Sequence, residues 1–178
     1  GGSTGFEFFR PALDAVAENA EARRIFADAN VIIEAAEAIA FVGCVDCRAA
    51  NNTILFPTTR VFRILQETVS TVDYSFAPAS DSAVSNNLVV YTTAEIVNAG
   101  RMLNIGANTD AASFTFTNNL WYATDDPSAA PALPDVVEVG SIHGQDPAVD
   151  TGDASDPRPQ AGSPAIGAGV AVAGIDRD

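Results

Sequence analysis

The sequence predicts an all-β fold, a parallel β-helix (a solenoid) of about four to five coils with a loop-rich C-terminal cap. Three patterns support it: a recurring asparagine followed by an apolar triplet, alternating apolar and polar residues before each asparagine, and a second apolar triplet farther upstream. With 178 residues, 47% of them hydrophobic, the chain can bury one continuous core. We expect coils over residues 1–124, and an acidic tail rich in proline, glycine and alanine over 125–178 that packs on the last coil.

The recurring unit is an asparagine followed by apolar or β-branched residues. The asparagines are Asn30, Asn52, Asn87 and Asn119, and they are 22, 35 and 32 residues apart. This uneven spacing indicates one structural unit with loops of variable length. Asparagine tolerates the left-handed backbone of a turn, and its amide can bond to the matching amide one coil away. We therefore expect these four residues to form a ladder along the stacked turns.

A second strand is predicted in each coil, with apolar outer residues that point into the core and a middle residue that points outward. The four triplets are centred on Glu7, Ala40, Arg63 and Asn104. Coils stack at about 4.8 Å, so these residues are expected to form a contiguous stripe on the outer face. Other polar residues lie nearby along the chain: Arg10, Arg60, Gln66, Glu67 and Arg101.

The N-terminal stretch admits a helical interpretation. Residues 11–38 are rich in alanine and glutamate, and a short helix or a turn within 11–22 would begin at Pro11. The segment from Asn30 to Ile33 nevertheless matches the other units in register. We therefore predict strand over 24–33.

The charge balance limits the partners. The net charge is −14, and all nine basic residues are arginines. Such a surface repels nucleic acids and anionic membranes, and no apolar run is long enough for membrane insertion. An anionic polysaccharide would need a metal ion or a local arginine cluster. High acidity without lysine favours an extracellular or salt-tolerant protein, and the start at Gly1 suggests a cut point or a processed end, so we expect a longer parent.

Few residues offer metal or redox chemistry. Cys44 and Cys47 fit three interpretations, namely buried core residues (favoured), a local disulfide, or a metal or redox pair. Residues 125–126 and 150–153 carry aspartates that could bind calcium, but they match no complete calcium loop. We therefore expect no cofactor and no metal site, with a structural calcium as the alternative.

Residues near the C-terminal end are assigned structural roles. His143 is expected in a turn or at the surface rather than as a general base, because no nucleophile motif accompanies it. Trp121 and Tyr122 are expected in the core or end cap rather than as sugar-stacking platforms. Residues 136–139 should form a short strand that helps to cover the final coil.

Two motifs resemble a known group of proteins. The segments 51–54 (NNTI) and 118–121 (NNLW) resemble the asparagine turns of right-handed parallel β-helix repeat proteins, the pectate-lyase-like superfamily. The segments 145–147 (QDP) and 161–169 (AGSPAIGAG) resemble the ending of many secreted bacterial β-helices, which a cell-surface anchor often follows. The resemblance implies the fold and a secreted or cell-surface location. It implies no single activity, because the superfamily includes lyases, hydrolases, epimerases, tailspikes, adhesins and proteins with no known activity.

The leading functional hypothesis is a secreted, carbohydrate-associated β-helix that forms the C-terminal part of a polysaccharide lyase or hydrolase. Its partner would be a polysaccharide or a cell-surface glycan. The candidate groove residues are Glu7, Arg63, Asn104, Arg10 and Glu67, with Arg63 as a substrate-binding or basic residue. The simpler interpretation is that these outward side chains are only solvated. The alternative function is a non-catalytic structural or adhesive module that self-assembles end to end into filaments through an open first coil.

Overall fold

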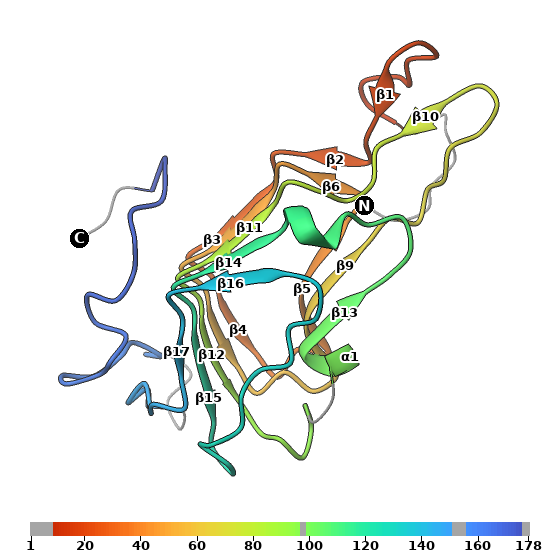
Figure 1. Cartoon of the computed structure of the whole chain (residues 1–178). Coiled ribbons are helices and arrows are strands. Elements are labelled where there is room, and N and C mark those ends of the chain that lie inside the picture. Colours follow the sequence, from red (N-terminus) through yellow and green to blue (C-terminus); the bar gives the residue numbers. More distant parts are fainter. Residues whose placement is uncertain (1–8, 97–98, 151–155, 176–178) are drawn as a thin grey trace.

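The computed structural model describes residues 9–96, 99–150 and 156–175 and is almost entirely β (Figure 1). Its helical elements are short, α1 (Ala99–Met102) and the 3-10 turn η2 (Ala111–Ser113). No helix in the described ranges is long and apolar enough to cross a membrane. An all-β architecture is therefore confirmed.

Three parallel sheets carry the structure, and neighbouring strands come from successive passes of the chain. Sheet I contains, in order, β3 (Phe26–Asp28), β7 (Arg48–Ala50), β11 (Ala83–Ser85), β14 (Thr115–Thr117) and β16 (Val137–Val139). Sheet II contains β4 (Val31–Ile33), β8 (Thr53–Leu55), β12 (Leu88–Tyr91), β15 (Leu120–Ala123) and β17 (Ile142–His143). Sheet III contains β5 (Glu37–Val42), β9 (Arg60–Leu65) and β13 (Leu103–Ile105). We call each pass through sheets I and II a coil; this arrangement is compatible with the predicted solenoid.

The turn between sheets I and II carries the asparagine ladder. Asn52 donates from its backbone N–H (3.0 Å) and its Nδ2 (2.8 Å) to Oδ1 of Asn87, and Asn87 makes the same pair of bonds to Asn119 (2.9 and 3.0 Å). Asn30 bonds to Asn52 in the same way. Left-handed backbone is found one residue earlier than predicted, at Ala29, Asn51, Asn86 and Asn118, whose φ angles are 55°, 56°, 56° and 52°.

Inward side chains stack in columns across the coils. In sheet I, Ala27, Ala49, Val84 and Phe116 are in register, and in sheet II, Ile32, Ile54, Val89 and Trp121 are in register. The last three residues of each column have no exposed area. The predicted inward positions of these strands, including Trp121, therefore lie in the core.

Of the two forms expected for the stretch 11–22, a helix or a turn, the helix is not found, because this stretch contains bends and two short strands. β1 (Glu18–Asn19) pairs with β10 (Ser75–Phe76), and together they form an arm that projects from the coils in Figure 1. β2 (Ala22–Arg23) pairs with β6 (Cys44–Val45). The Asp14 carboxylate accepts bonds from the N–H groups of Val16 and Ala17, a local turn that competes with helix formation. Within the predicted strand 24–33, residues 26–28 and 31–33 are strand (β3 and β4), and Ala29 and Asn30 form the turn between them.

Cys44 and Cys47 form a disulfide. Both residues are buried, as the favoured interpretation expected, but they are not free core thiols.

The coils continue past residue 124, because β16 and β17 extend sheets I and II. The predicted strand near 136–139 is β16. The inward register positions of this last coil are polar, since Glu138 pairs with Phe116 and His143 pairs with Trp121. Glu138 accepts a bond from the Trp121 indole N–H (2.8 Å), and its other oxygen lies 3.0 Å from Nε2 of the partly exposed His143. These groups close the C-terminal end of the stack together with the packed loop residues Ala129, Leu133 and Val136.

Candidate functional site

The outer face of sheet III carries the predicted stripe. Ala40 on β5, Arg63 on β9 and Asn104 on β13 are directly in register. Their strand neighbours Phe62 and Leu103 are buried in the core, so Arg63 and Asn104 lie partly exposed on the opposite side. The alternation of apolar and polar residues in each triplet produces this column.

Arg63 contacts Glu37, at the start of β5, and makes no ion pair with Glu67 in the described part of the chain. Nη1 of Arg63 lies 3.4 Å from Oε1 and 3.5 Å from Oε2 of Glu37. Glu37 is also in register with Arg60 and forms an ion pair with it. The sequence patterns did not identify Glu37 as a member of this site. It precedes Ala40 by three residues, as Arg60 precedes Arg63, and this repeated spacing was the available signal.

Two guanidinium groups thus share one carboxylate, which leaves a local excess of positive charge on a chain of net charge −14. The three side chains are 29–31% exposed, so the cluster is accessible from solvent. The Nε atoms of both arginines are buried and have no hydrogen-bond partner among the described residues. The cluster therefore presents two partly exposed guanidinium groups and one carboxylate to solvent. Guanidinium groups bind carboxylates through strong, charge-assisted hydrogen bonds.

Of the other predicted groove residues, Arg10 and Glu67 do not join this cluster. Glu7 lies outside the described residues. Arg10 is exposed and donates to the Phe9 carbonyl, and the Phe9 ring packs on Phe76 of β10, so Arg10 belongs to the arm. Glu67 is exposed just after the end of β9.

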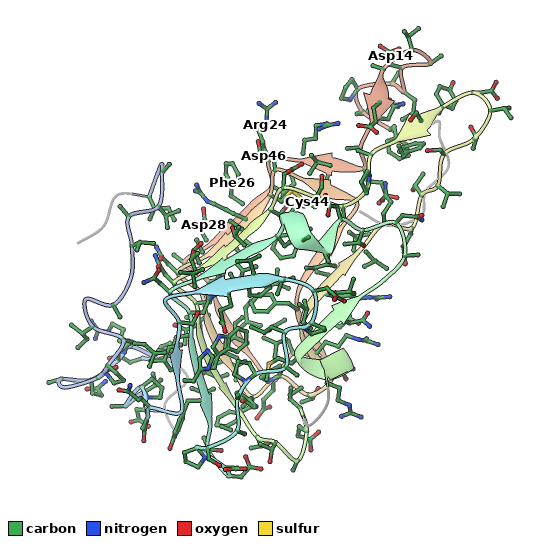
Figure 2. All side chains as sticks on the ribbon, in the orientation of Figure 1. Asp14, Arg24, Phe26, Asp28, Cys44 and Asp46 are labelled. Carbon is green, nitrogen blue, oxygen red and sulfur yellow. A yellow bond between two sulfur atoms is a disulfide. The ribbon has the colours of Figure 1, made fainter. Side chains whose placement is uncertain are left out.

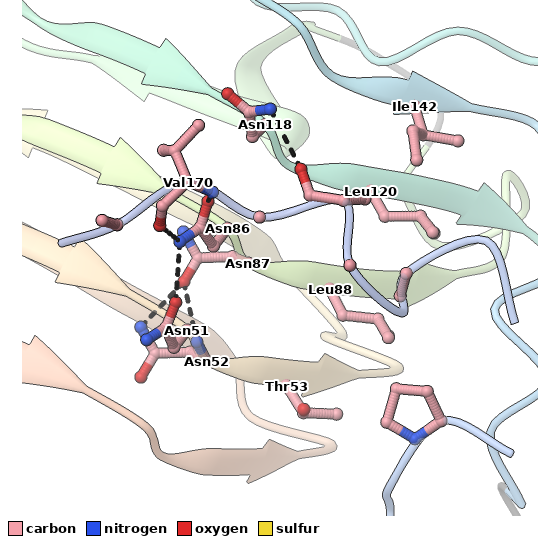
Figure 3. Close-up of a pocket in the computed structure, with 16 residues that line it drawn as sticks. Asn51, Asn52, Thr53, Asn86, Asn87, Leu88, Asn118, Leu120, Ile142 and Val170 are labelled. Atoms are coloured by element: carbon pink, nitrogen blue, oxygen red, sulfur yellow. Dashed lines mark hydrogen bonds between the residues drawn. The ribbon is translucent and has the colours of Figure 1, made fainter. Parts of the chain in front are cut away.

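A second surface lies over the asparagine turns, where the tail docks (Figure 3). Asn86 donates to the Val170 carbonyl (2.8 Å) and accepts from the Val170 N–H (3.0 Å), and Asn118 donates to the Ala168 carbonyl (3.1 Å). The tail therefore crosses several coils along their side rather than packing only on the last one. A cavity of ≈ 640 Å³ remains between the tail and the outer asparagines Asn51, Asn86 and Asn118.

We call the space between the docked tail and the coils the tail groove. The outer face of sheet II forms its floor. Leu55, Leu88, Val90 and Leu120 form a buried apolar cluster there, and Val149 and Ala165 of the tail pack against it. The sequence contained a signal for this second cluster, because residues 88–91 (LVVY) form a continuous apolar run. Strands covered on both faces have such runs instead of alternation.

Asp125, one of the proposed calcium ligands, is committed to a loop contact. Its carboxylate accepts bonds from the Thr93 N–H (2.8 Å), the Thr93 hydroxyl (2.8 Å) and the Ala94 N–H (3.2 Å). The bond from the Thr93 N–H is the main cause that lowers the pKa of Asp125 below its usual value. Within the described ranges, no three His, Cys, Asp or Glu side chains are grouped to hold a metal ion. Of the second candidate, residues 151–153 lie outside those ranges.

We expect replacing Asp125 with alanine to reduce the free energy of unfolding at pH 7. The lowered pKa means that the ionised carboxylate stabilises the fold above its unfolded-state pKa, and that this stabilisation is lost as the pH falls through the folded-state pKa. Urea unfolding of both proteins at several pH values should therefore show a difference that shrinks below about pH 4. Asp73→Ala is the control, because the Asp73 carboxylate makes no hydrogen bond in the described part of the chain. An unchanged difference down to the lowest pH would contradict this assignment.

Comparison with known proteins finds no matching family model, no matching curated protein and no matching solved structure. The functional argument therefore depends on the geometry of the chain's own residues.

Proposed function

We propose that this chain is part of a secreted right-handed parallel β-helix of the pectate-lyase-like kind, and that it binds an acidic polysaccharide or cell-surface glycan on sheet III. The observation that carries the proposal is the in-register column Ala40–Arg63–Asn104, with Arg60 and Glu37 beside it. The column runs across the strands, so a linear ligand would cross successive coils.

The chemistry of the cluster favours a sugar that carries a carboxylate. Arg60 and Arg63 outnumber the carboxylate that they share, so a second carboxylate from a uronic acid would complete the charge balance. Asn104 adds an amide that can donate to and accept from hydroxyl groups. Ala40, at the exposed end of the column, leaves room for a sugar ring beside the arginines. The strand spacing of about 4.8 Å is similar to the length of one sugar unit in an extended chain.

Export from the cell is supported by the Cys44–Cys47 disulfide, because disulfides persist mainly in oxidising compartments. The acidic surface without lysine is consistent with the same location. The ladder of asparagines across the turns supports the β-helix assignment, since each coil bonds to the next through the same atoms.

The polar groups on the last coil disfavour the alternative hypothesis, end-to-end filament formation. In a head-to-tail filament, the coil of β16 and β17 would be covered by the first coil of another copy. That contact would bury Glu138 and His143, which occupy inward register positions at the end. Burying such groups without new partners is costly. Polar inward residues at an exposed edge are a known protection against edge-to-edge pairing.

We expect Arg63→Gln to weaken the binding of galacturonic acid oligomers by roughly tenfold or more. A hydrogen bond to a charged group contributes about 1.5–3 kcal/mol, and 1.4 kcal/mol corresponds to a factor of ten. Binding would be measured by titration calorimetry at low ionic strength, alongside neutral galactose oligomers of the same length. The matched control is Arg158→Gln, which removes an arginine whose side chain is 80% exposed and paired with Asp156 in the tail.

The proposal requires the acidic oligomer to bind better than the neutral one, and it requires Arg158→Gln to leave that preference unchanged. An equal loss of affinity in both variants would show that the effect comes from net charge alone and not from the cluster. No binding of the acidic oligomer by the unmodified chain would overturn the proposal.

A further inference from the structure

Three asparagines of successive coils line the cavity of the tail groove, and the described part of the tail forms hydrogen bonds with only two of them. Asn118 donates to the Ala168 carbonyl (3.1 Å), and Asn86 bonds to both the carbonyl and the N–H of Val170. The third, Asn51, accepts a bond from Nδ2 of Asn86 (2.9 Å) through its Oδ1. Its own Nδ2 makes no hydrogen bond with any residue that the structure describes. The column therefore ends in a free amide donor at the cavity.

The tail leaves this column before it reaches Asn51. Arg48 donates from Nη1 to the carbonyl of Ala173 at 2.5 Å. Its guanidinium is held by Asp28 (2.7 Å) and lies 4.2 Å from the ring centroid of Phe26, and both partners lie on the outer side of sheet I in Figure 2. The tail is thus drawn toward sheet I, and Asn51 is left open.

A second polar group lies in the same coil as Asn51. The outward column of sheet II contains Val31, Thr53, Leu88, Leu120 and Ile142 in register, so Thr53 is the one polar residue among these five. Thr53 is partly exposed and lines the cavity, and its hydroxyl makes no hydrogen bond within the described ranges. An amide donor and a hydroxyl group therefore border an otherwise apolar floor.

The cavity itself suits a small, uncharged ligand. Its volume of ≈ 640 Å³ falls within the range of about 300–1,000 Å³ that is typical of small-molecule sites. The tail side of the cavity consists mainly of glycine and alanine, so its side chains leave this space open. None of the described residues that line it is charged, although the chain has a net charge of −14. A charged ligand would find no partner of opposite sign there, and burying an unpaired charge is costly.

We propose that this cavity binds a neutral sugar unit over Thr53. Sugar hydroxyl groups both donate and accept, so they pair with the Asn51 amide and the Thr53 hydroxyl together. The C–H groups of the ring pack on the apolar floor beside Leu88. A peptide backbone fits less well, because Asn86 holds Val170 with its amide oxygen as well as its nitrogen, and the oxygen of Asn51 already accepts a bond. The site is separate from the arginine cluster on sheet III, for which we propose an acidic sugar.

Matched sugars test this site by NMR of the ¹⁵N-labelled full chain. The probes are the methyl glycosides of galactose, glucose and mannose, and methyl galacturonoside is the charged counterpart of the galactose compound. A capped Ala-Gly-Ala peptide tests a peptide backbone as the ligand instead. The readout is the side-chain NH₂ signal pair of Asn51, which is assigned through its loss in Asn51→Ser. The NH₂ pair of Asn30 is the internal reference, because Asn30 does not line the cavity.

We expect a neutral glycoside to shift the Asn51 signals saturably and to bind roughly fivefold or more tightly than methyl galacturonoside. Thr53→Val removes the hydroxyl at nearly constant volume, and its neighbours in register, Val31 and Leu88, are apolar. This variant should weaken the binding about threefold or more, since one hydrogen bond is lost. The matched control is Thr115→Val, at an exposed position on sheet I, which should leave the binding unchanged.

Three results would overturn the assignment of a neutral sugar site. The first is that none of the three neutral glycosides shifts the Asn51 signals. The second is that the charged sugar binds as well as its neutral counterpart, or that the peptide alone binds. The third is that Thr53→Val weakens binding no more than Thr115→Val does.

Discussion

Replacing Asn87 with alanine should lower the free energy of unfolding by about 3 kcal/mol or more. Asn87 is 1% exposed, and its amide makes four hydrogen bonds: it accepts from the backbone N–H and Nδ2 of Asn52, and it donates to the Ala49 carbonyl and to Oδ1 of Asn119. Truncation leaves the buried Asn52 N–H without a partner. An unsatisfied buried donor or acceptor costs about 1–3 kcal/mol, and several are affected at once.

Asn30→Ala is the matched control, because Asn30 lies at the exposed end of the same ladder. Its side chain donates to Oδ1 of Asn52, and the bond from its backbone N–H to the same atom survives truncation. We expect it to cost under about 1 kcal/mol. Both variants would be unfolded in guanidinium chloride and followed by circular dichroism. Similar losses at the two positions would show that burial of the ladder adds nothing to its strength.

The ladder illustrates what the sequence could predict. Four asparagines in front of apolar triplets specify both a turn and a register, since every strand that follows must place the same face inward. The register pairs Val31–Thr53, Thr53–Leu88 and Leu88–Leu120 agree with the alignment of the four repeats. The triplets at Ala40, Arg63 and Asn104 were predicted for the same reason, because alternation is a local property of the chain.

The contacts between distant segments were not predictable in this way. Glu37 contacts Arg63 only because β5 and β9 pair in one register, and no local pattern shows which acid an arginine will reach. Similarly, the tail meets Asn86 across 84 residues of sequence. The helix considered for 11–22 does not form although its propensity is favourable, because the side chains of Asp14 and Asn19 and the pairing with β10 satisfy the backbone differently.

Replacing Phe62 with alanine should lower the free energy of unfolding by about 3–5 kcal/mol, because it leaves a cavity where the three sheets pack together. Phe62 on sheet III has no exposed area. Its ring packs edge-to-face on Phe116 of sheet I and on Trp121 of sheet II, with ring centroids 5.6 and 6.1 Å apart. Aromatic pairs of this geometry add about 0.5–1.5 kcal/mol to the burial itself. Trp121 is the single tryptophan of the chain, so its fluorescence reports this site directly.

The control is Phe26→Ala, since Phe26 is 53% exposed on the outer side of sheet I, next to the Arg48 guanidinium. Its loss removes little buried area and should cost under about 1 kcal/mol without changing the Trp121 emission. If Phe62→Ala lowers stability no more than Phe26→Ala does, the three sheets do not share one core. A large loss for Phe62→Ala with a red-shifted Trp121 emission would show that side chains from all three sheets stabilise one another across the coils, in addition to the ladder at their turns.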